Sequence, residues 1–434
     1  MERHQHSNKV VRQFKRTFSE TALNELGKAR RFCIREREVT PYRLALGLIE
    51  VFASARVETI ADLQRAFNAL CGTTVQYKPF HNQLAKAQFP EFTRALYERL
   101  LSELVCDVLR FNPQSPFARF SHITIHDGSS FAVKETLAHV FPGRFTTIKP
   151  AAVELHATLD LLTESLETVV LTPDSEAEVH QVPAPAALAG GLLLADRMFF
   201  IKAYLADITT HGGHFVVRTQ GRLNPLIRRA YRPDGREIKC WRGLALNEVK
   251  ARLSRFQEVD LDVLWGKPGP ALEARLLVSW DREEKRPRYL LTSLPREDFS
   301  FQQVLDAYRL RWQVELLFKE WKSYANLHAF ATSNPHLAEG LIWASLCAAT
   351  LTRYCAHMTQ RLMQVPVSTR KVAMCVHHVL TDIFHALLHC RRQLQRALRW
   401  ALAYLASNAQ RAHPKRDRLR GRLKLGLEHV YGVA

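Results

Sequence analysis

The spacing of hydrophobic and polar positions changes twice along this chain. Up to about residue 112 apolar residues recur every three or four positions, as in Tyr42–Phe52 and Phe92–Leu109, which is typical of amphipathic helices. After Asn112-Pro113 the pattern becomes short β-branched and apolar runs. Beyond Asn334-Pro335 the helical spacing returns. The pattern therefore predicts an α/β protein whose β-containing middle is flanked by helical regions.

Two of the apolar runs in the middle region lead into an aspartate. Residues 123–125 precede His126-Asp127, and Leu192–Ala195 precedes Asp196. The second run is continuously apolar, which suits a central strand buried on both faces. We therefore expect both aspartates at strand ends. Further strands are expected at 151–161, 166–171, 215–218, 237–241, 259–264, 274–280 and 288–292, with one short helix at 248–256.

A long helix is expected from Ser300 to about Ala325. Ser300 with Gln303 three residues later forms a capping-box signal, and neither Gly nor Pro follows until after Ala325. At 100° per residue its side chains separate into two faces. The apolar face consists of Leu310, Val314, Leu317 and Trp321, and the polar face of Tyr308, Arg311, Glu315, Lys319 and Lys322.

Composition restricts the partners of the chain. Its 434 residues hold 61 Lys and Arg against 42 Asp and Glu, a net charge of +19, which indicates a polyanionic partner such as nucleic acid. A membrane surface is the other candidate, but the most apolar runs are too short to span a bilayer and no signal peptide is evident. Eight cysteines without a CxxC pair favour reduced thiols and a cytoplasmic location.

Three carboxylates are the candidate reactive groups. Two-metal phosphodiester chemistry needs carboxylates that converge on Mg²⁺ from separate elements. Asp127, Asp196 and Glu315 combine two strand ends with a helix that packs on the same sheet. Each also has an ordinary interpretation: an Asx turn at Asp127, a helix N-cap at Asp196, and surface ion pairs of Glu315 with Arg311 and Lys319. Taken together in a basic chain, they favour the metal site.

The segment YRLRWQVELLFKEWK resembles the Tyr-x2-Arg-x3-Glu-x6-Lys signature of bacterial insertion-sequence DDE transposases, with Tyr308, Arg311, Glu315 and Lys322 in its four positions. ITIHDGSS and LLLADRMFF resemble the two aspartate motifs of that family. The resemblance is strongest over about 120–350. One departure is Met198, where the family often has glycine after the Asp-Arg pair.

The resemblance implies a fold and a division into domains. The fold is an RNase H-like mixed-sheet catalytic core interrupted by a β-rich insertion, with helical N-terminal and C-terminal regions. The expected boundaries are 1–112 for a helical DNA-binding region, 113–204 and 299–345 for the core, 205–298 for the insertion, and 346–434 for a helical region with a basic tail.

The resemblance also implies a chemistry. Asp127, Asp196 and Glu315 are expected to bind two Mg²⁺ ions, with Mn²⁺ as a substitute. Water would cleave at the element end, and the freed 3′-hydroxyl would attack target DNA. Tyr308, Arg311 and Lys322 are expected to hold phosphates, and Lys319, which lies on the same arc, is added on its position alone.

The expected partners are the terminal inverted repeats and the target DNA, bound by a homodimer. In relatives an aromatic side chain of the insertion stacks on a base drawn from the duplex, and Trp241, Trp265 and Trp280 are the candidates here. Each of these tryptophans is also a reasonable core residue of a small β domain.

Two weaker patterns remain. The segments 58–70 and 77–86 have the outline of a helix-turn-helix with Lys78, His81 and Lys86 facing DNA, although a plain helical hairpin fits nearly as well. A set of histidines and cysteines between Cys375 and Cys390 matches no closed zinc spacing.

Two rival functions share most of these features. One is a two-metal nuclease that cuts DNA without joining it. The other is a non-catalytic DNA-binding protein derived from a transposase, against which the intact set of three carboxylates argues.

Overall fold

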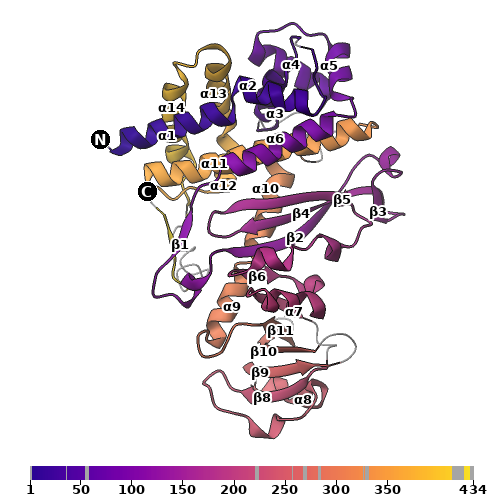
Figure 1. Cartoon of the computed structure of the whole chain (residues 1–434), viewed down its shortest axis with the longest axis vertical. Coiled ribbons are helices and arrows are strands. Elements are labelled where there is room, and N and C mark those ends of the chain that lie inside the picture. The colour runs from indigo at the N-terminus through magenta and orange to yellow at the C-terminus, as the bar shows by residue number, and fades with distance from the viewer. Residues whose placement is uncertain are drawn as a thin grey trace.

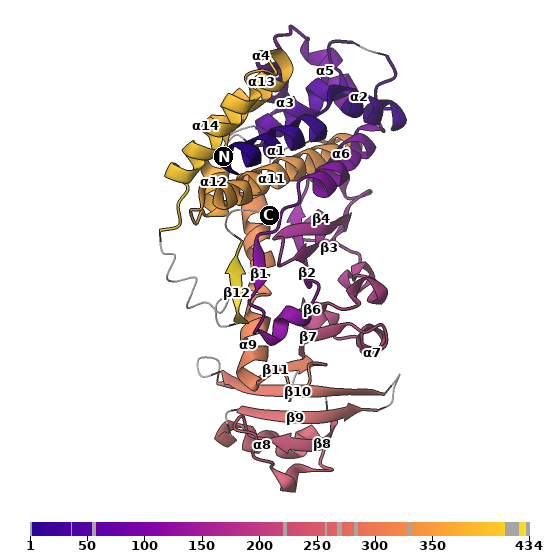
Figure 2. The same ribbon diagram turned by 60° about the vertical axis from the view of Figure 1, so that its left-hand side comes forward.

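The computed structural model describes residues 2–35, 37–53, 58–219, 224–256, 258–266, 271–281, 285–325, 327, 332–412 and 425–430, with the side chains of 2–9 and 254–256 excepted. The molecule is elongated (Figure 1). Helices from both ends of the chain form one end, a sheet forms the middle, and a smaller group of strands with one helix forms the other end. Turning the view by 60° keeps this order of layers (Figure 2).

The helical end combines the N-terminal and C-terminal regions around one buried helix. This is α11 (Pro335–Met363), which packs against α3, α6, α12 and α14 and whose apolar stretch is buried as its sequence predicts. The other helices of this end are α1 (Glu2–Thr17), α2 (Glu20–Ala29), α3 (Pro41–Ala53), α4 (Ile60–Cys71), α5 (Tyr77–Leu84), α6 (Phe89–Glu103), α12 (Thr369–Cys375), α13 (His377–His389) and α14 (Leu394–Asn408).

A mixed sheet forms the middle of the molecule, so the class is α/β as predicted. Within the described residues its strands run in the order β3-β4-β2-β6-β7-β11-β10-β9-β8, with β5 paired to β4. The first strands are β2 (Ile123–Ala132), β3 (Pro142–Phe145), β4 (Lys149–Asp160), β5 (Ser165–Pro173), β6 (Leu192–Ala195) and β7 (His214–Thr219), and β1 (Leu109–Phe111) pairs separately with β12 (Leu427–His429).

Strand β6 is central and is buried on both faces, as its continuous apolar run predicts. Leu192 and Leu194 belong to the larger hydrophobic core, whereas Leu193 and Ala195 belong to a second core. Because successive side chains of a strand point to opposite faces, one strand contributes to both cores. β6 pairs in parallel with β2 on one side and with β7 on the other.

The far end of the molecule continues the same sheet. Its elements are β8 (Leu226–Tyr231), α8 (Leu246–Phe256), β9 (Glu258–Trp265), β10 (Leu272–Asp281) and β11 (Arg286–Thr292). Helix α7 (Lys202–Thr210) lies between them and the middle of the sheet, against β7 and β10. Arg275 of β10 is buried against Asp260 of β9 and donates a hydrogen bond of 2.7 Å to the carbonyl of Phe299. The outer strands are thereby tied to the segment that enters the next helix.

The expected single helix from Ser300 is divided into α9 (Phe301–Arg309) and α10 (Trp312–Tyr324). The Ser300–Gln303 capping box is present. At Leu310 and Arg311 the backbone keeps helical angles, but the amides of both residues bond to carbonyls three positions back. This is one tighter 3₁₀ turn, which rotates α10 relative to α9. A pattern of apolar and polar residues does not reveal such a turn, because both helix types conserve the pattern over a few residues.

Two strand predictions are corrected. Strand β2 does not end at Asp127 but continues to Ala132, because its pairing with β4 extends to that residue. Segment 237–241 forms a single bridge at Glu237 followed by the short helix η6 (Lys239–Trp241) rather than a strand. The remaining short 3₁₀ helices are η1 (Pro116–Arg119), η2 (Glu135–Leu137), η3 (Glu178–Gln181), η4 (Pro185–Leu188) and η5 (Arg197–Phe199).

In the described part of the chain no individual helix has the length and apolarity to cross a membrane, although the bent pair α12–α13 meets that test by length and composition. Most of the predicted basic tail, residues 413–424, lies outside the described residues.

Candidate active site

Arg311, at the N-cap position of α10, reaches the middle of β2. One guanidinium nitrogen of Arg311 lies 3.0 Å from a carboxylate oxygen of Asp127. The other nitrogen donates to the carboxylate of Glu315, one helical turn further along. Arg311 therefore bridges two of the three predicted carboxylates. The guanidinium and Asp127 are largely buried, whereas Glu315 is more than a third exposed.

Asp196 is brought to the same place by the register of the sheet. The last paired residues of the two strands are His126 of β2 and Ala195 of β6, so the next residue of each strand is an aspartate. The Tyr308 hydroxyl, from the last turn of α9, donates to Asp196 over 3.4 Å. Burial raises the pKa of this hydroxyl, so it stays protonated and can donate. Asp196 also stands at the N-cap position of η5, but its side chain makes no capping bond there.

Two buried neighbours hold the aspartates in position. The His126 ring bonds to the Thr158 hydroxyl on β4 at 3.0 Å. Its other side meets the Phe199 ring, with the centroids 5.0 Å apart. Since His126 precedes Asp127 and Phe199 follows Asp196 by three residues, this contact couples the backbone beside one aspartate to the backbone beside the other.

The site carries mutually repelling charges in a buried place. Burial raises the pKa of Asp127 to about 6, while Arg311 and the N–H of Gly128, 3.0 Å away, oppose the rise. The negative charges of Asp196 and Glu315 raise the Asp127 pKa further. These couplings require the three carboxylates to lie near one another, and a cation is what makes such a cluster stable.

The predicted lysines take up different roles in this arrangement. Lys322 donates a hydrogen bond of 2.8 Å to the carbonyl of Ser130 on β2, and burial together with nearby Lys149 lowers its pKa. Lys319 is exposed and its ammonium lies 6.0 Å from the centre of the Trp312 ring. Lys322 therefore ties α10 to β2, and Lys319 faces solvent.

Two residues that the sequence reasoning missed lie at this site. Arg218 follows Val217, which pairs with Ala195, so it lies beside Asp196, and its charge acts on the Tyr308 hydroxyl. The strand-end argument that found Asp196 could have found Arg218 as well. Trp312 is 54% exposed on the helix that carries Glu315. The alternation of apolar and polar positions gives no reason to expect an exposed tryptophan there.

Two of the three candidate tryptophans of the insertion are buried. Trp241 and Trp265 are buried in the second hydrophobic core, at 1% and 7% exposure, so neither offers a face to DNA in this arrangement. The two segments of the outlined helix-turn-helix do form helices, α4 and α5, joined through Gly72 in the left-handed conformation. Lys78 is exposed, whereas Lys86 bonds to the carbonyl of Phe32.

The fit of a metal ion follows from the chemistry of the three carboxylates. Asp and Glu oxygens are the ligands that Mg²⁺ and Mn²⁺ prefer, so the set is suitable. In the described residues, however, no group of three or more His, Cys, Asp or Glu side chains is close enough to hold an ion, and this includes the histidines and cysteines between 375 and 390. At the carboxylates the positive charge is supplied by the Arg311 guanidinium.

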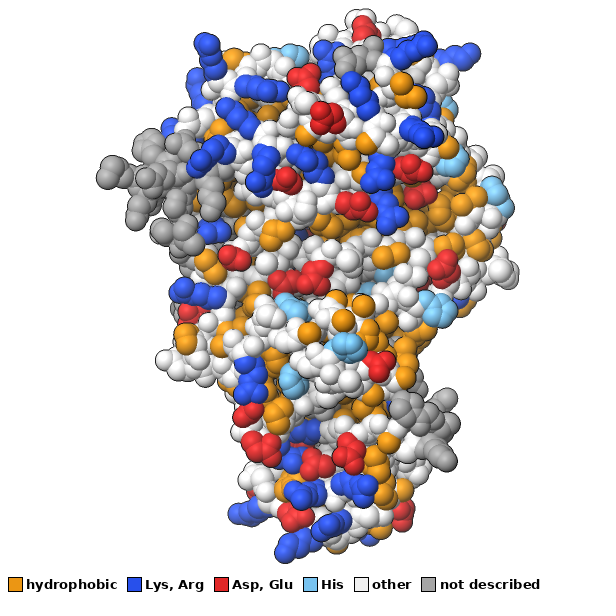
Figure 3. All heavy atoms as spheres, in the orientation of Figure 1, with side chains coloured by type: hydrophobic (Ala, Val, Ile, Leu, Met, Phe, Trp, Pro, Cys, Tyr) orange, Lys and Arg blue, Asp and Glu red, His pale blue; other side chains and the backbone are white. Residues whose placement is uncertain are grey.

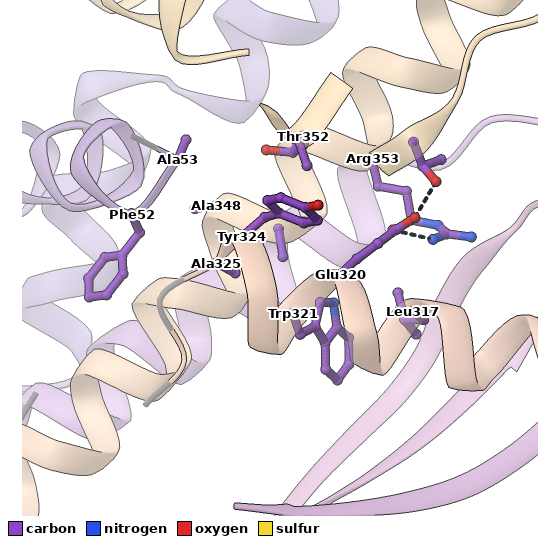
Figure 4. A pocket seen from close by; sticks show the side chains of 13 residues that line it. Phe52, Ala53, Leu317, Glu320, Trp321, Tyr324, Ala325, Ala348, Thr352 and Arg353 are labelled. Atoms are coloured by element: carbon purple, nitrogen blue, oxygen red, sulfur yellow. Dashed lines mark hydrogen bonds and ion pairs between the residues drawn. The ribbon is translucent and has the colours of Figure 1, made fainter. Parts of the chain in front are cut away.

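The opposite face of α10 is anchored by a buried ionic network. Glu320 accepts a hydrogen bond from Thr369 and one of 3.2 Å from Arg353 on α11. Arg353 also donates to the carbonyl of Glu164, at 2.7 Å, and the Glu164 carboxylate lies 3.2 Å from His357. Figure 4 shows Glu320 and Arg353 pointing toward one another beside a cavity of about 20 Å³, room for about one water molecule.

A family model described as "Transposase DDE domain" matches residues 118–351, a span that contains all three carboxylates. The chain is 21% identical to the transposase for insertion sequence element IS231E of Bacillus thuringiensis subsp. finitimus, over 90% of this chain and 89% of that protein.

Two further relatives extend the comparison. The transposase for element IS231F of Bacillus thuringiensis subsp. israelensis is 20% identical over 93% of this chain and 92% of its own length. A 62-residue segment is 53% identical to the putative transposase InsL for element IS186A of Escherichia coli (strain K12), covering 14% of this chain and 17% of that one.

Proposed function

Because the chain belongs to the family of bacterial insertion-sequence transposases with a DDE domain, we propose that Asp127, Asp196 and Glu315 are its catalytic carboxylates. It is a DNA transposase, an enzyme of phosphoryl transfer. The proposed reaction is cleavage at the element ends followed by strand transfer into target DNA. The expected substrate is the terminal inverted repeats, bound by a homodimer.

The observation that carries the proposal is the hydrogen-bond network of Arg311 and Tyr308. Arg311 contacts Asp127 and Glu315, and Tyr308 contacts Asp196. Groups from α9 and α10 thus reach all three carboxylates, which are far apart in the sequence. A surface ion-pair ladder along α10 alone would not include the two strand aspartates.

Proteins of this family use divalent metal ions, and the proposed ligands are the same three carboxylates. Two Mg²⁺ ions bound there would activate the attacking oxygen and stabilise the leaving oxygen. Arg311 can form two parallel hydrogen bonds with one phosphate. In the structure its two terminal nitrogens bond to two different carboxylates, those of Asp127 and Glu315. Tyr308, Lys319 and Lys322 add a hydroxyl donor and two point charges to the same surface.

The fold assignment is part of the proposal. Strands β2, β4, β5, β6 and β7 with α10 would form the RNase H-like core, and the strands from β8 to β11 with α8 the β-rich insertion. Supporting this division, β6 separates two hydrophobic cores, one shared with the helical end and one with the outer strands. The predicted boundary between 204 and 205 divides α7 and places β7 in the insertion, although β7 pairs with β6.

The test is Mg²⁺-dependent cleavage and joining of labelled element-end DNA by wild type and by Glu315→Gln. The variant keeps the shape of the side chain but loses the charge, so it is expected to bind DNA and lose at least about a hundredfold in cleavage rate, the scale typical of losing a charge-stabilising group. Asp382→Asn, at an exposed position on α13, is the matched control. Cleavage by Glu315→Gln at the wild-type rate would contradict the proposal, and cleavage without joining by wild type would indicate a nuclease.

A further inference from the structure

One face of α14 is exposed although the helix is packed on its other side. Leu394, Leu398 and Leu405 are buried against the neighbouring helices. Arg396 and Trp400, four residues apart, stand on the opposite face, and Arg392 lies in the turn just before the helix; all three are exposed. Residues at i and i+4 of a helix lie in one row, so Arg396 and Trp400 share a row of α14, and Arg392 precedes this row in the chain. We call Arg392, Arg396 and Trp400 together the α14 ridge.

Aromatic side chains continue the α14 ridge toward α13. The Trp400 ring, 45% exposed, lies 5.4 Å from Tyr404, and Tyr404 lies 5.9 Å from His378. His378 in turn lies 3.9 Å from His377. Flat rings beside arginines are the combination that proteins use against nucleic acid, because the rings can contact sugars and bases while the arginines bind phosphates.

The charge of this region is strongly one-sided. Residues 364–411 contain seven Arg and Lys and a single acidic residue, Asp382. Arg391 is paired with Glu20 of α2 at 3.5 Å. For Arg392 and Arg396, in contrast, the part of the chain that the structure describes contains no ion-pair partner. Many Lys and Arg side chains also lie over the helical end of the molecule in the face seen in Figure 3.

We propose that the α14 ridge, with Arg392, Arg396 and Trp400, binds the phosphate backbone of duplex DNA away from the cleavage site. The proposal rests on the proposed function only in taking DNA as the substrate. Charge complementarity selects the occupant: two unpaired guanidinium groups, in a segment with a single acidic residue, would repel an identical ridge on a second copy of the chain, but would attract a polyanion.

The test is the salt dependence of DNA binding by the full-length protein without divalent metal, so that nothing is cleaved. The probe is a fluorescein-labelled random-sequence duplex of about 40 base pairs, titrated between about 50 and 300 mM KCl. The slope of log K against log salt is negative, and each lost phosphate contact makes it shallower by about 0.9. Arg392→Ala/Arg396→Ala is therefore expected to make this slope shallower by about 2 and to weaken binding at least about tenfold near 100 mM salt.

Two further variants make the result specific. Trp400→Ala is expected to weaken binding without changing the slope, because an uncharged ring releases no counterions. Arg94→Ala/Arg119→Ala removes two exposed arginines that are already paired, with Glu98 and Asp298, and should leave the slope unchanged. Thermal unfolding of every variant checks that the fold is intact.

A wild-type slope in Arg392→Ala/Arg396→Ala overturns the proposal. If Trp400→Ala instead converts a dimer to a monomer in sedimentation, the α14 ridge is an interface between copies of this chain, and the proposal is again wrong. The cleavage assay is separate: a changed slope in a protein that never cleaves DNA contradicts the proposed function alone, whereas an unchanged slope in an active enzyme contradicts only this inference.

Discussion

A single residue, Arg311, compensates the charge of carboxylates that repel one another. Three carboxylates in a partly buried site repel one another, and burial already raises the pKa of Asp127 to about 6. The guanidinium compensates two of these charges at once. The guanidinium N–H groups that donate to Asp127 and Glu315 cannot donate to a phosphate at the same time. Binding of a metal ion and release of Arg311 toward DNA are therefore expected to be linked.

Replacing Arg311 with Met should expose this linkage. Without the guanidinium the carboxylates lose their counter-charge, so the metal-free variant should be less stable, and a divalent ion should stabilise it more than it stabilises wild type. The measurement is the shift in thermal midpoint on adding about 5 mM Ca²⁺, a hard oxygen-ligand cation like Mg²⁺. Arg309→Met, whose arginine pairs with Asp306 at 2.8 Å, is the control. Equal shifts in wild type and Arg311→Met would refute the linkage.

At the scale of elements, α10 is held on both sides. Its polar face is tied to β2 by Arg311 and Lys322. Its other side is tied to α11 by the Glu320–Arg353 pair, which lies beside the cavity of Figure 4. The 3₁₀ turn at Leu310 and Arg311 leaves α10 free to take its own direction. The position of Glu315 therefore depends on contacts that α10 makes at both of its faces.

Glu320→Ala is expected to lower stability by about 2 kcal/mol, because it removes a hydrogen-bonded carboxylate from the largely buried Arg353, which then keeps only the Glu164 carboxylate at 3.8 Å. Urea unfolding measures the change. Ser323→Ala, at an exposed position of the same helix, should be neutral within about 0.5 kcal/mol. Glu315→Gln should be less destabilising than Glu320→Ala. The two variants therefore distinguish a glutamate that stabilises α10 from one that acts in the reaction. A loss no larger than that of Ser323→Ala would show that the network contributes nothing net.

For the whole molecule, one continuous sheet carries two hydrophobic cores. The candidate active site lies at the strand that the two cores share, where β2 and β6 stop pairing. Buried polar side chains also lie in this sheet. His156 of β4 bonds to the Thr172 hydroxyl of β5 at 2.9 Å. Burial, with a smaller effect of Arg144, lowers the pKa of His156 to about 4. This ring is therefore neutral in the folded protein at neutral pH.

His156 should make the fold sensitive to acid. In the unfolded chain it titrates near its ordinary pKa of about 6.5. Between that value and about 4 the unfolded state binds more protons than the folded state, so stability falls as the pH is lowered through this window. Thermal unfolding of the metal-free protein from pH 7 to pH 4 measures the fall.

Glu154 acts in the opposite direction, because burial and Glu178 raise its pKa to about 7. The difference between wild type and His156→Gln therefore isolates the histidine. The variant should lose less stability than wild type on acidification, whereas His378→Gln, at an exposed histidine, should follow wild type. Parallel curves for wild type and His156→Gln would disprove the assignment.

The sequence by itself determined the local features. The capping box at Ser300, the apolar face of α10 and the continuous run of β6 depend on neighbouring residues, and each is found as predicted. The two aspartates and Glu315 were singled out in the same way, by their place on an element. Such features are readable because helix and strand periods fix which side chains share a face.

Only the tertiary structure decided which groups meet. The extension of β2 past Asp127 follows from its pairing with β4, and the place of Arg218 from the pairing of β7 with β6. The burial of Trp241 and the exposure of Trp312 and Trp400 depend on which elements cover each helix or strand. The physical reason is the same in each case: pairing and packing join residues of different elements, such as Ala132 with Ala152 and Ala195 with Val217, and no local period encodes that choice.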